Sequence, residues 1–417
     1  MHDPDKRSPG FGAPTSESPR SRSAAERPES ELVARPAVAI AGCGAITAVG
    51  DGIDALRTAL RVNASGLRSD TRFDQPRFQS SIVGTAPQNG AGFDNDDPAF
   101  RLATEALRQA RQDALASLKG VPTERVGLVL STTKANIESL ERLAENRPCS
   151  EAARRHLQAD LLAVDLAAIH GAKGPIQCVS VACISGLVAL QQGAKIIQRG
   201  EADAVFVVGV DHLSAFVVAG FTALKAIDPV GCRPFDRDRC GLSPGEAGAA
   251  IVLVKRHAQP SAITIRGWAT TNDANHMTGP SRDGSGLALA IRRALDSTAL
   301  VPGEIDYINA HGTGTPYNDA MESQALRVVF GESCPPVSGF KGMLGHTLGA
   351  AGVVETILCV LAMQDRVVPG TPRLTAAAEG TPASLMREPC AASRLDYILK
   401  LNTGFGGVNA ALILGHE

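Results

Sequence analysis

The chain has 417 residues, 44% of them apolar, and a formal net charge of −2 with histidine neutral. That length and apolar content are sufficient to bury a large core. The charge balance lacks the basic face of nucleic-acid-binding proteins, so we expect no nucleic-acid partner. No apolar run reaches the roughly 20 residues that span a bilayer, and the N-terminus lacks the apolar stretch of a secretion signal. We therefore expect a cytoplasmic protein with no membrane partner.

The chain contains nine cysteines. No CxxC pair occurs among them, which argues against a zinc ribbon. We expect a reduced intracellular protein in which all but one of these cysteines are small core side chains.

Residues 1–35 are rich in Pro, Ser, Arg and Glu and contain almost no large apolar side chains. Such a segment cannot bury enough surface to offset the entropy lost on ordering. It is predicted to be a disordered tail.

The first folded half is expected over residues 36–257. It begins with an apolar run at residues 37–41, predicted to be a buried strand that ends in a turn at Gly42. Helices are expected over about residues 97–118 and 150–169, with a strand at 126–130 between them. A buried strand at 176–181 leads into a helix that ends near residue 198. Strands at 204–208 and 249–254 complete this half.

The second half is expected over residues 258–417 and repeats this rhythm. Its predicted elements are a strand at 263–265, a helix over about 286–297, a strand at 306–309, a helix over 319–330, a strand near 337, a helix after Gly352, and strands near 397–399 and 410–414. Apolar strands that alternate with helices indicate sheets covered on both faces. The similar order of the two halves suggests an internal duplication.

Cys183 stands in the sequence VACISG, between a predicted strand and a predicted helix. A thiol at a helix N-terminus faces the positive end of the helix dipole, which favours the thiolate. Its small neighbours leave room for an acyl group to reach the sulfur. A structural cysteine at a strand–helix junction is the alternative, and this motif alone leaves both interpretations open.

Two histidines lie in turns rich in Gly and Thr. His311 stands in NAHGTGTP after a predicted strand, and His346 stands in GHTLGAAG shortly after Lys341. A histidine in such a turn faces a cleft more readily than a core, although a structural histidine is an alternative. The spacing of the two does not match a ligand motif such as HExxH, so no metal is expected.

The stretch NTGFGGVN at residues 402–409 is a Gly-rich loop that carries one bulky ring, Phe405. It predicts either a tight turn between strands or a mobile aromatic gate whose backbone amide faces the cleft.

Together these motifs resemble the beta-ketoacyl-acyl-carrier-protein synthases, specifically the elongating Cys-His-His branch of the thiolase superfamily. The resemblance covers about residues 37–417 and includes RPFD at residues 233–236, Gly245-Glu246, and the stretch 273–278. It implies an α/β fold, the thiolase-like duplicated five-layer α/β/α/β/α arrangement. It also implies a homodimer, or a heterodimer with a related ketosynthase-like subunit.

The resemblance implies that Cys183 accepts an acyl group from the phosphopantetheine arm of an acyl carrier protein. The backbone N–H groups of Cys183 and Phe405 would form the oxyanion hole. His311 and His346 would donate hydrogen bonds to the enolate left when malonyl-carrier loses CO2. The product is a chain two carbons longer, and no further cofactor is expected.

Lys341 and Glu355 resemble the charged pair that stands behind the two histidines in this family. A buried lysine needs an acidic partner, and either Glu355 or Glu322 could serve. We expect the role of Lys341 and Glu355 to be mainly structural positioning.

The resemblance also implies substrate-binding residues. Thr313 and Thr315 match hydroxyls that bond the pantetheine amides, and Phe405 and Gly406 match the loop beside the substrate. Simple turn chemistry is the alternative for the two threonines.

The sequence departs from the family pattern at Cys240, Leu242, Gly314, Thr403 and residues 131–136. None of these positions is the cysteine, either histidine or Lys341. The departures therefore concern the substrate pocket, and they favour pigment, polyene or other secondary-metabolite assembly over fatty-acid synthesis.

Three alternative functions share part of this sequence pattern. A chain-length-determining partner subunit keeps the fold but typically lacks the nucleophile, and Cys183 argues against it. Degradative thiolases and CoA-primed synthases use Cys-His-Cys or Cys-His-Asn sets, which His346 does not fit. A scaffold in a biosynthetic complex is the third alternative.

Overall fold

The computed structural model describes residues 37–87, 96–255 and 262–416. The expected tail and the expected boundary between residues 257 and 258 lie outside these ranges. The strands are β1 (Val38–Thr47), β2 (Gly50–Asp51), β3 (Arg68–Ser69), β4 (Ile82–Val83), β5 (Val126–Ser131), β6 (Ile176–Val179), β7 (Ala204–Asp211), β8 (Ala247–Lys255), β9 (Thr264–Asn272), β10 (Tyr307–Asn309), β11 (Val337–Ser338), β12 (Val367–Val368), β13 (Cys390–Ala391), β14 (Tyr397–Gly404) and β15 (Val408–Gly415). The helices are α1 (Ile53–Arg61), α2 (Pro98–Asp113), α3 (Leu115–Leu118), α4 (Ile137–Ala144), α5 (Glu151–Arg155), α6 (Ala159–His170), α7 (Ser185–Gln198), α8 (Ala215–Ala223), α9 (Ser285–Asp296), α10 (Pro316–Phe330), α11 (Lys341–Leu344) and α12 (Ala351–Asp365).

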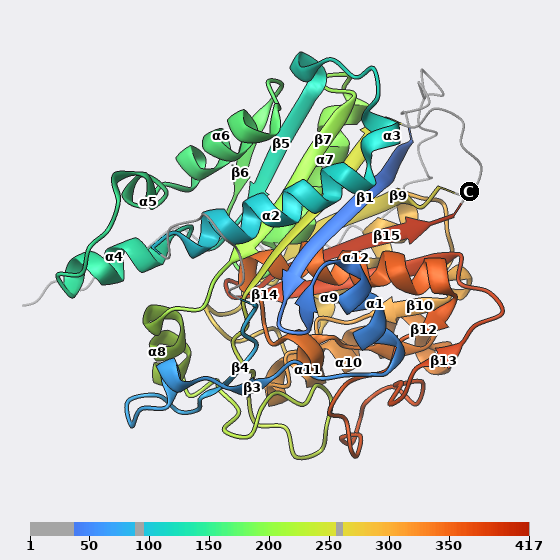
Figure 1. Cartoon of the computed structure of the whole chain (residues 1–417). Coiled ribbons are helices and arrows are strands. Elements are labelled where there is room, and N and C mark those ends of the chain that lie inside the picture. The colour runs from blue at the N-terminus through green and yellow to red at the C-terminus, as the bar shows by residue number, and fades with distance from the viewer. Residues whose placement is uncertain (1–36, 88–95, 256–261, 417) are drawn as a thin grey trace, which may run out of the picture. The chain divides into compact units, whose positions relative to one another are not determined.

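The main sheet consists of two half-sheets with the same strand order (Figure 1). The first runs β6-β5-β7-β8-β1 and the second runs β11-β10-β14-β15-β9. In both, the first three strands are parallel and the last two pairings are antiparallel. A short β1–β9 pairing joins the halves. This repeat confirms the duplication expected from the sequence.

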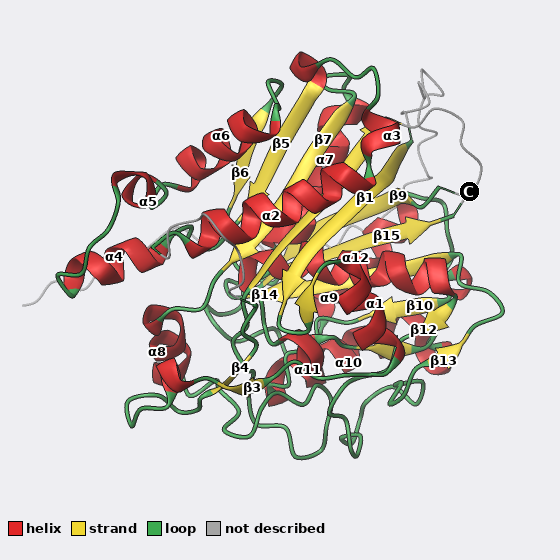
Figure 2. Cartoon of the chain, viewed as in Figure 1, coloured by secondary structure: helices red, strands yellow, loops and turns green. Residues whose placement is uncertain are grey.

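The helices form three layers around the two half-sheets. Helices α7 and α12 lie in the middle and contact strands of both half-sheets. Helix α2 packs across β1, β7 and β8, with α6 beside it on β5 and β6, and Figure 2 shows α2 crossing the front of the strands. Helices α9 and α10 cover the second half-sheet. The five-layer α/β fold is therefore confirmed, and its middle layer forms the largest apolar core.

Strand β1 does not end at Gly42 as predicted but continues to Thr47. A Cβ atom on Gly42 would lie 2.4 Å from the carbonyl oxygen of Ala110, and one on Gly44 would lie 2.1 Å from that of Ala106. The glycines therefore allow α2 to pack closely on the strand. Glycine within a run of strand residues can mark either a turn or such a close approach. The sequence pattern alone cannot distinguish this use from a turn.

The strand predicted at 176–181 is confirmed as β6, but the prediction that it is buried is wrong. β6 ends at Val179 and exposes Ile176, Gln177 and Cys178, and within the described residues it pairs with β5 alone. An edge strand lacks a neighbouring strand on one side. The length and composition of an apolar run do not show whether the strand will lie at an edge. The helix expected over 150–169 is also two helices, α5 and α6.

All nine cysteines are free thiols. The prediction that all but one would lie in the core is wrong for Cys178, Cys240 and Cys390, which are exposed.

One described segment, Leu348–Asp365, is long and apolar enough to cross a membrane by composition. However, 89% of it is buried inside the protein, and it carries the charged side chain of Glu355. It is the core helix of the middle layer, which needs apolar residues all round because sheets cover both its faces.

Candidate active site

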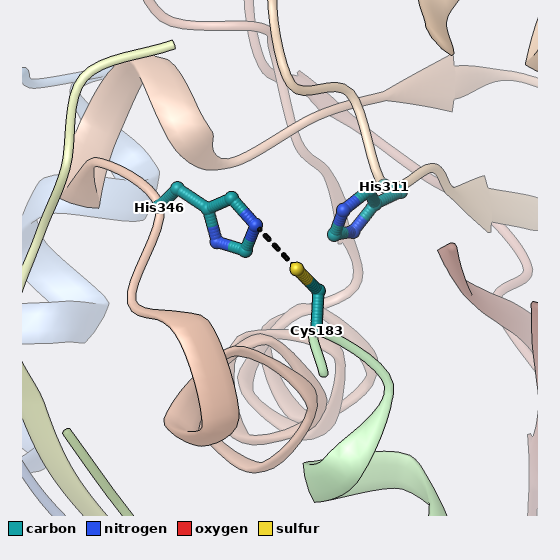
Figure 3. Close-up of side chains that lie close together, drawn as sticks. All are labelled: Cys183, His311 and His346. Atoms are coloured by element: carbon teal, nitrogen blue, oxygen red, sulfur yellow. Dashed lines mark hydrogen bonds between the residues drawn. The ribbon is translucent and has the colours of Figure 1, made fainter. Parts of the chain in front are cut away.

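Loops at equivalent places in the two half-sheets converge on one site. Cys183 lies between β6 and α7, and His346 lies at the equivalent place between β11 and α12. His311 follows β10, and Phe405 follows β14. The rings of His311 and His346 have centroids 5.2 Å apart, and both point toward the sulfur of Cys183 (Figure 3). The structure thus brings together the three residues on which the predicted chemistry depends.

Cys183 sits in a tight turn before α7. Ala182 has a φ of 45°, a conformation that costs a non-glycine residue energy and persists only when its surroundings enforce it. Ser185 enforces the turn, since its hydroxyl donates to the Ala182 carbonyl (2.6 Å) and accepts from the Val181 N–H (2.8 Å). The result places the sulfur at the start of the helix, 9% exposed.

His346 directs a proton at the sulfur. Its Nε2 lies 3.1 Å from Sγ of Cys183, the contact drawn in Figure 3. Its Nδ1 accepts a hydrogen bond from the backbone N–H of Leu348 at 3.2 Å. A neutral imidazole that accepts at Nδ1 carries its proton on Nε2. His346 is therefore a hydrogen-bond donor toward the cavity.

His311 has the same tautomer for a different reason. Its Nδ1 lies 3.1 Å from Nζ of Lys341 and 2.8 Å from Nδ2 of Asn402, and both of these nitrogens are donors. The proton is therefore on Nε2. Burial, together with the charge of Lys341, holds the pKa values of both His311 and His346 well below the usual range, so both rings are neutral.

Lys341 is fully buried and has three acceptors for its three protons. Besides Nδ1 of His311, its Nζ donates to the backbone oxygen of that residue (2.6 Å) and to Oε1 of Glu355 (2.7 Å). The other carboxylate oxygen of Glu355 lies 2.7 Å from Nζ of Lys400, which is also fully buried. Although burial raises it, the charges of Lys341 and Lys400 bring the pKa of Glu355 below its ordinary value.

Glu322 is the acid that does not pair with Lys341. Its two oxygens accept the backbone N–H groups of His311 (2.6 Å) and Gly312 (2.7 Å). Burial and the nearby charge of Asp319 raise the pKa of Glu322 to about 7. Glu322 thus holds the backbone of the His311 turn, while Glu355 forms ion pairs with both lysines behind it.

The resting form of Cys183 differs from expectation. Burial raises the pKa of the Cys183 thiol to about 11, although the charge of Lys341 and the backbone N–H of Phe405 lower it. The thiolate expected from the helix N-terminus is therefore a minor species near neutral pH.

Cys183, His311 and His346 offer three potential metal ligands within 4.8 Å of one another. A histidine that binds a metal through Nε2 donates its Nδ1–H to an acceptor. Here Nδ1 of each ring faces a donor, the Leu348 amide or the Lys341 ammonium, so the Nε2 lone pairs are not available. The donor set therefore suits hydrogen bonding better than metal coordination.

A cavity of about 520 Å³ opens onto these side chains. Thr313, Thr315 and Phe405 line it, and the two threonine hydroxyls lie 2.8 Å apart. Gly406 does not line it; the N–H of Gly406 instead donates to the carbonyl of Met277 at 2.7 Å. Polar groups at the wall and a thiol inside are features of a substrate-binding cavity.

A second cavity of about 320 Å³ also reaches Cys183 and Phe405. The ring centroids of Phe405 and Phe221 lie 6.2 Å apart, and both residues line both cavities. Phe405 therefore stands at the border between the two cavities, beside the sulfur.

The sequence interpretation missed Lys400, Asn402 and Asp211. A signal existed for Lys400, because a lysine inside the apolar run YILKL of β14 must be buried and needs a counter-charge. Asn402 and Asp211 gave no such signal, since their contacts depend on residues far away in the chain.

Comparison with known families decides the class of this protein. The family model described as beta-ketoacyl synthase, N-terminal domain, matches residues 35–259, and the one for the C-terminal domain matches residues 262–375. The chain belongs to the beta-ketoacyl synthase family. As the motifs predicted, this beta-ketoacyl synthase is an acyltransferase.

Its relatives include a polyketide synthase subunit and a 3-oxoacyl-[acyl-carrier-protein] synthase. The chain is 32% identical to the tetracenomycin polyketide synthase ketoacyl synthase alpha subunit of Streptomyces glaucescens, over 90% of this chain and 96% of that protein. It is 30% identical to 3-oxoacyl-[acyl-carrier-protein] synthase 2 of Staphylococcus aureus, over 90% and 97%. Among solved structures, the ishigamide ketosynthase/chain length factor superposes with a TM-score of 0.85 at 29% identity, covering 92% of this chain and 100% of that one.

Proposed function

We propose that this beta-ketoacyl synthase joins malonyl-carrier protein to an acyl group held on Cys183, with loss of CO2, and so extends the acyl chain by two carbons. The observation that carries the proposal is the pair of imidazole N–H groups that face the sulfur, each fixed in its tautomer by a donor at Nδ1. Two such donors suit an oxygen that becomes negative during a reaction.

In the first step, the Cys183 thiolate attacks the thioester of an acyl carrier protein. A new C–S bond forms, the C–S bond to the carrier's phosphopantetheine breaks, and the leaving sulfur takes up the proton that the Cys183 thiol has given up. The transient oxyanion would accept from the backbone N–H groups of Cys183 and Phe405. The chain itself would need no cofactor, because the carrier protein brings the substrates.

In the second step, malonyl-carrier binds in the same cavity and its C–C bond to the carboxylate breaks. The electron pair moves into an enolate whose oxygen accepts hydrogen bonds from His311 and His346. The enolate carbon then attacks the acyl group, and the Cys183 thiolate leaves and regains a proton.

Other residues hold these groups in place. Lys341 and Glu355 would act as positioning residues, since Lys341 contacts His311, Glu355 contacts Lys341, and neither lines the cavity. Thr313 and Thr315 would bond the pantetheine amides, and Gly406 would shape the loop that carries Phe405. Phe405 would act as a gate between the two cavities.

We infer that the chain is the catalytic subunit of a pair rather than its chain-length-determining partner, because the cysteine and both histidines are present. The exposed edge strand β6 supports a dimer with an identical or related subunit, since an open strand edge readily pairs with another chain. We further propose a cytoplasmic enzyme of polyene or polyketide assembly.

Acyl loading tests the proposal. The protein should take up an acyl group from acyl-carrier protein at Cys183, as measured by peptide mass spectrometry. Cys183→Ala should abolish the uptake, whereas Cys390→Ala, which changes an exposed thiol, should not. Acylation of another residue, or no acylation, would contradict the assignment of Cys183 as the acceptor of the acyl group.

A further inference from the structure

A lysine, Lys134, lines the second cavity, which also reaches Cys183. Lys134 follows β5, the strand that corresponds in the first half-sheet to β10, which precedes His311. The duplicated fold therefore places Lys134 and His311 after corresponding strands of the two halves. Lys134 and Cys183 both line the second cavity.

Lys134 is buried but incompletely partnered. Its side chain is 8% exposed, and its Nζ lies 3.1 Å from Oδ1 of Asp211, which is 0% exposed. No described residue accepts a hydrogen bond from this ammonium. Since an ammonium has three protons to donate, at least two lack an acceptor.

Asp211 does not need the lysine. Its carboxylate accepts hydrogen bonds from the hydroxyl groups of Thr132 (2.9 Å) and Thr133 (2.8 Å) and from the backbone N–H of Gly349 (2.7 Å). These neutral donors satisfy the carboxylate. Asp211 therefore does not require Lys134 as a hydrogen-bond donor. Pairing with Asp211 does not explain why the Lys134 ammonium is buried at this cavity.

The other walls of this cavity are mostly apolar, and they include Ala182, Phe216, Val217, Gly220, Phe221, Leu224 and Leu348. A plain alkyl chain would cover the ammonium without giving it an acceptor, which is costly for a buried charge. A chain with an oxygen at the level of Lys134 would complete its hydrogen bonds.

We propose that Lys134 is a specificity-determining residue that selects acyl groups bearing a carbonyl or hydroxyl oxygen over plain alkyl groups of the same length. The inference rests on the proposed function, because it takes the second cavity as the place of the acyl chain on Cys183. It adds the substrate class: partly oxygenated chains, as arise when earlier carbonyl groups are left unreduced.

Matched thioesters test this inference. Each pair has one alkyl chain and one chain of equal length with a single keto oxygen, placed at successive positions across the series. The rate of Cys183 acylation is measured by mass spectrometry. A hydrogen bond to a charged group predicts a preference of about tenfold or more for at least one keto member.

Lys134→Met keeps the length of the side chain but removes its charge, so it should abolish the keto preference while alkyl loading continues. Lys173→Met, at an exposed lysine elsewhere, should keep the preference. No preference in the unaltered protein, or an equal preference in Lys134→Met, would overturn the inference. Failure of every thioester to load Cys183 would instead contradict the proposed function.

Discussion

The Nζ atom of Lys400 lies 2.7 Å from Oε2 of Glu355, and the two side chains are 0% and 2% exposed. Glu355 binds Lys341 through its other oxygen, so one carboxylate forms ion pairs with two buried lysines behind His311. Because both lysines pair with Glu355, loss of this carboxylate should destabilise the cluster more than loss of Lys400.

Glu355→Gln should therefore destabilise the protein more than Lys400→Met. The first change leaves two buried charges without a counter-ion, a loss of about 3–5 kcal/mol for a broken buried pair. The second leaves the Lys341–Glu355 pair intact. The free energy of unfolding in urea measures both, and an equal or larger loss in Lys400→Met would contradict the shared-carboxylate arrangement.

The reactivity of Cys183 should rise steeply with pH. With a thiol pKa of about 11, the thiolate fraction increases about tenfold for each pH unit below that value. Alkylation of Cys183 by iodoacetamide, followed on its own peptide, should therefore keep rising between about pH 7 and 10. Because the Lys341 charge lowers this pKa, Lys341→Met should slow alkylation at every pH in that range. A plateau of the alkylation rate below pH 8 would show that burial does not set the pKa of the Cys183 thiol.

Gly42→Ala should destabilise the first half-sheet by about 1–3 kcal/mol, the usual cost of overpacking. The new methyl group would lie 2.4 Å from the carbonyl oxygen of Ala110 and force α2 away from β1. Gly303→Ala is the matched control, because nothing lies within 4 Å of a Cβ atom there. The difference in melting temperature between the two variants measures the effect, and equal values would argue against close helix–strand packing.

The sequence predicted the alternation of strands and helices, the duplication, and the set of Cys183, His311 and His346. These features depend on local pattern and on motifs that each lie within one loop. The exposure of β6, the continuation of β1 through Gly42 and the partner of Lys341 depend on which elements become neighbours. Local sequence does not contain that information, so either acid could be assigned to Lys341 until the fold placed Glu355 beside it.

The same limit explains why the sequence marks Lys134 only as part of the segment 131–136, which departs from the family pattern. Its position in the chain says nothing of its distance from Cys183, which follows a different strand. The shared cavity becomes visible only when β5 and β6 lie side by side with their carboxyl ends together.

Decarboxylation without condensation tests the central claim most directly. In Cys183→Gln the thiol is absent but both imidazole donors remain, so release of CO2 from malonyl-carrier protein should continue. Adding His346→Ala or His311→Ala to this variant should slow CO2 release by about 10²-fold or more, the usual effect of losing one oxyanion donor. Unchanged CO2 release in both double variants would contradict the role given to the two histidines.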